Sequence, residues 1–441
     1  MIVRAISHAI HRMVAPFYHF FFSVPVLFAA AIFRSAGATA IVMATLWIAQ
    51  SIIDGMVERS GGVVLIVKSI FTNDASDGLI EYLVNHTTEL LNFTLDVVRP
   101  SGVNTKGKPG ESPQNQYWEL DLKKPENWQA VGAQIQRVLL TIGKIITLGL
   151  LPKLPLSIST VDMNIEIDSD FKNGQPPSPT YVAAYSGPTH PDVIGEKWIY
   201  INGIGNERVW FEGACRKIRS AFKREVTGVF NRSDGILWDM IQCFGEHSTV
   251  EDHKNSKNKL IQRTESSRAA QEALYNEVHN TLWPKDGSVK PNKVVLICHS
   301  QGCLLTRLTL QQLVSDYPDD SPEREDMRTK LRVFPFANPS MDWRVVDDGA
   351  IQYLGNSTHT TEHFAHRVDF VAMLGVISNF EDKTSGFDDQ NSKVFVSIPE
   401  PKLGRPAVGH LFGAHYSLDP IAYEDGKHSK LFKALGGNPI P

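Results

Sequence analysis

A serine directly after an apolar strand is the first candidate for chemistry in this 441-residue sequence. The stretch VVLICHSQGC (294–303) contains an apolar run, then Ser300, then the start of a leucine-rich segment. A strand, a sharp turn at a serine and an immediate helix form a nucleophile elbow, which needs small residues two positions either side of the serine. Gly302 meets that need, and Cys298 stands where the usual pattern has a glycine. We therefore predict that Ser300 is a nucleophile; the alternative is an ordinary turn after a buried strand.

Serine alone is a poor nucleophile, so a base and an orienting acid must follow it in the chain. After an elbow of this kind the order is Asp or Glu, then histidine. Asp369 lies at the end of an expected strand in HRVDFVAM, and Asp342, one strand earlier, is the fallback. Two histidines, His410 and His415, follow the last expected strand, and their position alone leaves both open as the base.

Attack by a serine on a carbonyl also needs backbone N–H groups that hold the negative charge of the reacting oxygen. The start of the helix behind Ser300 offers the N–H of Gln301. The loop in YINGIGNE offers a second donor, because Gly203 lets the backbone turn tightly and leaves the N–H of Ile204 to complete the oxyanion hole. The Gly-Ile-Gly triplet is weak as a nucleotide-binding signal, since the rest of the dinucleotide fingerprint is missing.

From residue 180 onward, short β-branched runs alternate with helix-length segments. This alternation predicts an α/β fold with a mostly parallel sheet and helices on both faces, with ligands bound beyond the carboxyl ends of the strands. The expected strands cover residues 197–203, 225–231, 293–300, 331–338, 363–373 and 393–400, and the expected helices cover about 206–222, 235–244, 266–282 and 303–314. In the helix over 206–222 one face is apolar, and Arg216, Lys217 and Arg219 are expected to point outward. The cationic residues from Arg216 to Arg224 are expected to form a solvated face rather than an anion site.

Several other polar residues receive non-catalytic interpretations. His359, His363 and His366 have a spacing that could bind a metal, but no cysteine or acidic partner completes a four-ligand set, so we expect no metal site. The adjacent Asp347 and Asp348 are expected to be solvated loop charges. Asp419 precedes Pro420 and is expected to start a helix rather than to orient a histidine.

Composition limits the partners and the compartment. The formal net charge is −4 and no long basic run is present, so nucleic-acid binding has no electrostatic support. The four cysteines form no Cys-x-x-Cys pair, and two of them flank Ser300, which favours reduced thiols and a reducing compartment for the catalytic domain. The Asn-x-Ser/Thr triplets, at Asn85, Asn92, Asn231 and Asn356, are about as many as chance gives and leave the compartment open.

The first sixty residues differ from the rest. Two apolar stretches, 17–33 and 36–53, are long enough together for one membrane span or a tight hairpin, so we predict an N-terminal membrane anchor over 1–60. A cleaved signal peptide fits poorly, and a buried helical hairpin is the remaining alternative. Residues 61–180 are expected to form a helical and linker region with Pro/Gly-rich loops, and residues 181–441 the catalytic domain.

The segment from about residue 190 to 420 resembles an α/β-hydrolase of the lipase/esterase type. More narrowly, it is similar to a group of membrane-associated fungal proteins that look like serine hydrolases. The shared segments are WIYINGI, VTGVFNRSDGILWDMIQC, the elbow HSQG, the acid in DFVA, and the ending GHLFGAHYSL. The substrates of this group are unassigned.

The resemblance implies the α/β-hydrolase fold and assigns roles to three residues. Ser300 would be the nucleophile, Asp369 the acid and His415 the base, with His410 in the same shared ending as the alternative base. The sequence departs from the pattern at Cys303, where a second glycine is common after HSQG.

Together these observations predict a membrane-associated serine hydrolase that cleaves a carboxylic ester or thioester of a lipid or protein and needs no cofactor. The same triad also serves peptidases and acyltransferases. One alternative is a catalytically inactive hydrolase-like scaffold at a membrane. Another is a purely structural membrane protein, which leaves the order of the three residues to coincidence. The sequence does not fix the oligomeric state.

Overall fold

The computed structural model describes residues 178–233, 265–285, 287–398 and 409–441, together with residue 119, positions between 124 and 137, and residues 239, 243 and 250. The strands in this part are β1 (Thr180–Ala183), β2 (Glu196–Ile201), β3 (Val226–Val229), β4 (Lys293–His299), β5 (Leu331–Phe336), β6 (Arg344–Asp347), β7 (Ala350–Tyr353), β8 (Thr360–Ala365) and β9 (Ser392–Val396). The helices are α7 (Arg208–Phe222), α11 (Glu265–Leu282), α12 (Gln301–Asp316), α13 (Pro322–Lys330), α14 (Phe370–Leu374), α15 (Val376–Asn379) and α16 (Lys430–Lys433). Short 3₁₀ turns are η3 (Pro191–Val193), η4 (Leu354–Ser357), η5 (Pro420–Ala422), η6 (Gly426–His428) and η7 (Leu435–Gly437).

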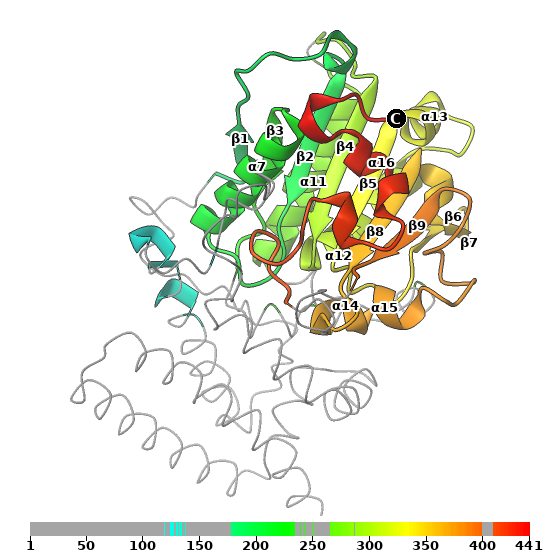
Figure 1. Ribbon diagram of the computed structural model, residues 1–441. Coiled ribbons are helices and arrows are strands. Elements are labelled where there is room, and N and C mark those ends of the chain that lie inside the picture. The colour runs from blue at the N-terminus through cyan, green and yellow to red at the C-terminus, as the bar shows by residue number, and fades with distance from the viewer. Residues whose placement is uncertain are drawn as a thin grey trace, which may run out of the picture.

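The described part is built around a seven-stranded sheet. Figure 1 shows this sheet with helices packed around it. Its strand order is β1-β3-β2-β4-β5-β8-β9. All neighbouring pairs are parallel except the edge strand β1, which runs antiparallel to β3. The predicted mostly parallel α/β sheet is therefore confirmed. The chain leaves β2 for β3 on one side and returns to β4 on the other, and such a reversal of strand order opens a crevice at the carboxyl ends.

Helices cover both faces of this sheet, as the side chains of β2 demonstrate. The Trp198 ring lies 4.8 Å from Phe222 of α7, and the Tyr200 ring stacks on Phe211 of the same helix. The next residue, Ile201, points to the other face and lies against Gly302 of α12. Because successive strand residues point to opposite faces, α7 and α12 must lie on opposite sides of the sheet.

The predicted strands match β2, β3, β4, β5 and β9, with differences at their ends. The predicted strand over 363–373 was wrong in its position: β8 ends at Ala365, and residues 370–374 form α14. Asp369 caps that helix, because its Oδ1 accepts the N–H of Val371 at 2.9 Å. The apolar residues around Asp369 have no period that separates a strand from a short buried helix. The predicted helix over 235–244 lies almost wholly outside the described residues.

The hairpin β6–β7 was not predicted from the sequence. It turns at Asp348 and Gly349, which both have positive φ, 46° and 78°. Two such residues make the type I′ turn that matches the twist of a hairpin, and Asp-Gly is a preferred pair for it. The dipeptide was therefore a readable turn signal, and Asp348 has a conformational role rather than only a solvated charge.

Two basic residues expected on the outer face of α7 or just after it are buried. Lys217 is 4% exposed, although the prediction placed it in solvent. Arg224 is also 4% exposed, and its Nε lies 3.0 Å from Oε2 of the buried Glu196. Arg216 does remain partly exposed and pairs with Glu212 one turn away. Helical periodicity identifies the face on which a residue lies. It does not show whether other segments place hydrogen-bond acceptors against that face, where they could bind a buried charged group.

The predicted membrane anchor over 1–60 lies outside the described residues. Among the residues that the structure does describe, no helix combines the length and apolar character needed to cross a bilayer.

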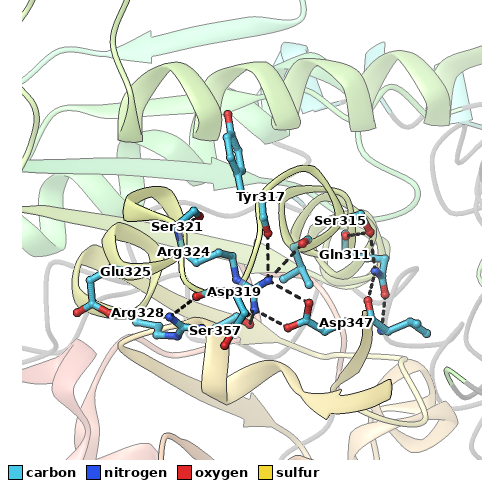
Figure 2. Close-up of polar contacts among 12 residues, drawn as sticks. Gln311, Ser315, Tyr317, Asp319, Ser321, Arg324, Glu325, Arg328, Asp347 and Ser357 are labelled. Atoms are coloured by element: carbon cyan, nitrogen blue, oxygen red, sulfur yellow. Dashed lines mark hydrogen bonds and ion pairs between the residues drawn. The ribbon is translucent and has the colours of Figure 1, made fainter. Parts of the chain in front are cut away.

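A buried arginine joins three elements at the far end of α12 (Figure 2). Arg324 of α13 is 2% exposed and binds both carboxylate oxygens of Asp347 in β6, at 2.7 and 3.2 Å. It also donates to the carbonyl of Val314 in α12 and to Asp319. Asp347, which was expected to be a solvated loop charge, is therefore a structural ion-pair partner.

We expect Arg324→Met to lower the free energy of unfolding by about 3–5 kcal/mol, because it leaves Asp347 half-buried without its bidentate partner. The matched control is Arg328→Met on the same helix. Its partner Asp319 is 71% exposed, so the loss should stay below about 1 kcal/mol. Urea unfolding followed by circular dichroism measures both. Equal losses in the two variants would contradict the structural role of the buried pair.

Candidate active site

Ser300 occupies a strained turn between β4 and α12. Its φ and ψ are 56° and −127°, outside the regions that residues with a side chain usually adopt, and it is fully buried. Such a conformation costs on the order of 1–3 kcal/mol and persists only where the surroundings enforce it. Here the Ser300 N–H donates to the carbonyl of Phe336 in β5, and the Ser300 carbonyl accepts the N–H of Cys303. The elbow predicted from the sequence is therefore present as a local structure.

Two glycines make room for this turn. A Cβ on Gly203 would lie 2.3 Å from the Ser300 Cβ, and a Cβ on Gly302 would lie 2.7 Å from the carbonyl oxygen of Asn202. Gly203 does not have a positive φ. Its role is to let the loop after β2 approach the serine, and the positive φ (60°) belongs instead to Gly205.

The cysteines beside the elbow are accommodated in the core. All four cysteines of the chain are free and buried. Cys298 occupies the first glycine position of the motif, in register with Ile201 and Pro335 on the neighbouring strands. Cys303 occupies the position of the missing second glycine, and its Sγ lies 3.4 Å from the Phe336 carbonyl. The helix therefore packs against the sheet with a thiol at each of these positions.

His410 connects Ser300 with Asp369. Its Nε2 lies 2.8 Å from the Ser300 Oγ, and its Nδ1 lies 2.9 and 3.0 Å from the two carboxylate oxygens of Asp369. An ionised carboxylate only accepts hydrogen bonds, so Nδ1 carries the proton and Nε2 is left to accept from the serine hydroxyl. All three side chains are buried, with exposures of 2% or less.

His415, the histidine that the resemblance favoured as the base, does not lie between Ser300 and Asp369. Its Nδ1 accepts the backbone N–H of Leu411 at 3.0 Å, and its ring packs against Gly409. Burial, and to a smaller extent the neighbouring His366 and His410, lower the pKa of His415 to about 3. A neutral ring that already accepts a backbone bond shapes the turn 411–415. The preference for His415 is therefore corrected in favour of His410, which had been kept as the alternative.

The negative charge of Asp369 is stabilised inside the protein. Burial by itself raises the pKa of this carboxyl group, but the charge and hydrogen bond of His410 and the hydroxyl of Tyr416 outweigh it and lower the pKa to about 2. The Tyr416 hydroxyl donates to Oδ2 at 2.6 Å. Sequence reasoning missed Tyr416, although it directly follows the "HY" histidine. Asp369 is thus ionised at neutral pH and can orient the imidazole.

The imidazole of His299 supports the backbone of His410. Its Nε2 lies 2.7 Å from the His410 carbonyl, and since a carbonyl only accepts, the proton must be on Nε2. Burial, followed by the nearby His410, lowers the pKa of His299 well below its ordinary value, so this ring stays neutral. The residue just before Ser300 therefore fixes the backbone of His410, the histidine that contacts the serine.

The expected oxyanion hole lies beside an amide network. The side chain of Asn202 donates to the carbonyl of Asn231 and accepts its N–H, which joins the ends of β2 and β3. The Asn231 side chain donates to Oε1 of Gln301 at 2.7 Å. Ile204 follows Gly203, which contacts Ser300, and Gln301 begins α12 directly behind it. The two expected donors therefore belong to segments that meet at the serine.

Asn231 is buried and its side-chain amide nitrogen donates to Gln301, so this Asn-x-Ser triplet is not an accessible glycosylation site.

The fallback acid and the histidine cluster lie elsewhere. Asp342 forms ion pairs with Arg307 and Arg344, so its carboxylate is committed to structure. His363 has its Nδ1 3.4 Å from the Asn338 amide, and His366 has its Nδ1 3.0 Å from the Ser397 hydroxyl. Among the described residues, no group of three or more His, Cys, Asp or Glu side chains could hold a metal ion. Asp419 does cap the 3₁₀ turn η5, as expected, through the N–H of Ile421.

The geometry permits nucleophilic chemistry at Ser300. A hydroxyl that donates to an imidazole nitrogen without a proton, while the other ring nitrogen donates to a carboxylate, can lose its proton as the oxygen attacks. Searches of known protein families, curated proteins and solved structures found no match to this chain.

We expect the stability difference between the native protein and Asp369→Asn to depend on pH. The folded-state pKa of Asp369 is about 2 against an ordinary 3.8, so its carboxylate contributes about 2 kcal/mol that is fully present above pH 3.8. The contribution is lost as the pH falls from 3.8 through 2. The difference in free energy of unfolding should therefore narrow over that window, which urea titrations at a series of pH values would measure.

The control for this experiment is the same Asp369→Asn change in a His410→Gln background. Without the imidazole, the interaction that lowers the pKa is largely gone, so the narrowing should shrink. A difference that stays constant between pH 5 and pH 2 in the native background would contradict the ion pair.

Proposed function

We propose that this protein is a membrane-associated serine hydrolase of the α/β-hydrolase type that cleaves a carboxylic ester or thioester. One observation carries the proposal: the strained Ser300 donates to His410, which donates to the buried carboxylate of Asp369. A serine at a turn needs neither a positive φ nor a histidine partner for structural reasons. Both features together favour a nucleophile that is held ready for attack.

The proposed reaction has two halves. The Ser300 Oγ attacks the carbonyl carbon while His410 Nε2 takes its proton, and the resulting oxyanion is held by the N–H groups of Ile204 and Gln301. The imidazolium, stabilised by Asp369, then protonates the leaving alcohol or thiol as the acyl bond to it breaks. In the second half water attacks the acyl-serine, His410 takes the water proton, and Ser300 recovers it as the acid leaves.

The chain order supports the α/β-hydrolase assignment within this proposal. Ser300 follows β4, Asp369 follows β8, and His410 follows the last strand β9. These segments lie far apart in the sequence and meet at the carboxyl ends of parallel strands, where ligands bind in such sheets. The apolar N-terminal stretches support attachment to a membrane, and hence an acylated lipid or protein as the substrate class.

A second candidate function is a hydrolase-like scaffold without catalysis. The full burial of Ser300 favours it, because a substrate carbonyl reaches the Oγ only after part of the chain moves. The intact hydrogen-bonded set of three residues favours catalysis instead.

Covalent labelling with diisopropyl fluorophosphate separates these two functions, since the reagent is small enough for a confined site. We expect the full-length chain to label at one site. Ser300→Ala should abolish labelling, and His410→Ala should slow it on the order of 10²–10⁴-fold, the contribution of a general base.

The matched control is His415→Ala, which removes a neighbouring buried histidine without touching Ser300. It should label far faster than His410→Ala. If the order of the two histidine variants is reversed, His415 is the base after all. A folded native protein that does not label would favour the scaffold.

A further inference from the structure

The loop that carries His410 has little regular structure of its own. Residues 409–419 contain one turn, at 412–415, and no strand or helix. The position of the imidazole therefore depends on the groups that bind this loop from outside. Two such contacts lie close to Ser300: His299 contacts the His410 carbonyl, and Asp369 accepts the hydroxyl of Tyr416.

A buried lysine supplies a larger set of contacts from the other side. Lys217 of α7 donates to the carbonyls of Phe412, Gly413 and Tyr416 at 2.8, 3.1 and 2.6 Å. An ammonium group has three N–H donors, so all of them are used on this one loop. Figure 1 shows the residues after 409 (red) running alongside α7 (green). Without Lys217, three buried carbonyls would lose a charged donor.

A buried carboxylate from the segment before the sheet completes this arrangement. Glu119 is 2% exposed, and its Oε1 accepts the N–H of Gly413 at 2.7 Å. A Cβ on Gly413 would lie 2.5 Å from the same oxygen, so a side chain at this position would displace the Glu119 carboxylate. Burial raises the pKa of Glu119 and lowers that of Lys217 to about 8, and the attraction between the two groups opposes both shifts.

Burying two charges is unfavourable unless geometry and hydrogen bonds compensate, and hydrophobic replacements are often as stable. Stability alone therefore does not account for the Lys217–Glu119 pair. The pair reaches three backbone positions within the six residues that follow His410, and one of these, Tyr416, also binds Asp369. It therefore fixes the backbone on which both the base and the tyrosine donor depend.

We propose that Lys217 and Glu119 are positioning residues that hold the 409–416 loop, and with it His410, against Ser300. Through Glu119, a residue far from the loop in the sequence contributes to the geometry of the site. Loss of this carboxylate would release Gly413, and the imidazole would lose its alignment with the serine. The role of His410 as a base rests on the proposed function; its placement by the pair does not.

The test compares Lys217→Met with the native full-length chain. A buried carboxylate that holds an imidazole N–H gives a strongly downfield proton signal, assigned here by its loss in Asp369→Asn. In Lys217→Met this signal should disappear or shift upfield. The rate of labelling by diisopropyl fluorophosphate should fall on the order of 10²-fold, as expected for misplacement by about 1 Å.

Arg216→Met is the matched control, because it removes a partly exposed cation from the same helix and should change neither readout. Glu119→Gln keeps an acceptor for Gly413 but removes the charge, so a smaller slowing, less than about tenfold, is expected. Glu119→Ala also removes the acceptor and should slow labelling further. If Lys217→Met does not fold, the two Glu119 variants still test the positioning role, because Glu119 is the member of the pair that lies outside α7.

The outcomes separate the two proposals. A folded Lys217→Met protein that keeps both the native signal and the native labelling rate would overturn the positioning role. If the native protein fails to label, but its downfield signal is lost in Lys217→Met, the pair positions His410 in a protein that is not a hydrolase.

Discussion

The close contact between the loop after β2 and the strained turn at Ser300 is the constraint on which the rest of the structure depends. It requires glycine at 203 and 302, since a Cβ at either position would collide with backbone or with the serine. The amide network of Asn202 and Asn231 holds the β2 and β3 loops in place and reaches Gln301 at the start of α12. A conformation that costs on the order of 1–3 kcal/mol is thereby maintained by the sheet around it.

Burial gives the polar groups at this site their properties. Asp369 remains ionised because its interactions with His410 and Tyr416 outweigh the cost of burying its charge. His299 and His415 remain neutral because no interaction outweighs the effect of burial on their pKa values. Neighbouring histidines therefore have different roles according to their partners. In the same low-polarity surroundings, the hydrogen bonds of Lys217 and Glu119 to the 409–416 loop offset part of the cost of burying the two charges.

The sequence predicted those features that depend on local pattern. The turn at Ser300, most of the parallel strands and the position of Asp369 after β8 were readable from apolar runs, small residues and chain order. The choice between His410 and His415 was not readable, because both lie in one irregular loop whose path is set by contacts from α7, β4 and residue 119. The same limitation explains why Lys217, Arg224 and Asp347 were wrongly expected in solvent. A charged residue can be buried when segments distant in the sequence supply its partners, and the local spacing of residues does not reveal those partners. The Asp-Gly turn of β6–β7, in contrast, was a local signal that was overlooked.

The central claim is that Ser300 is a nucleophile activated by His410. Peptide mapping by mass spectrometry, after the full-length protein has reacted with diisopropyl fluorophosphate, tests this claim most directly. The account predicts a single phosphoryl adduct on the peptide that contains Ser300, formed in the native protein and absent after denaturation before treatment. An adduct on another residue, or a folded protein that carries none, would contradict it.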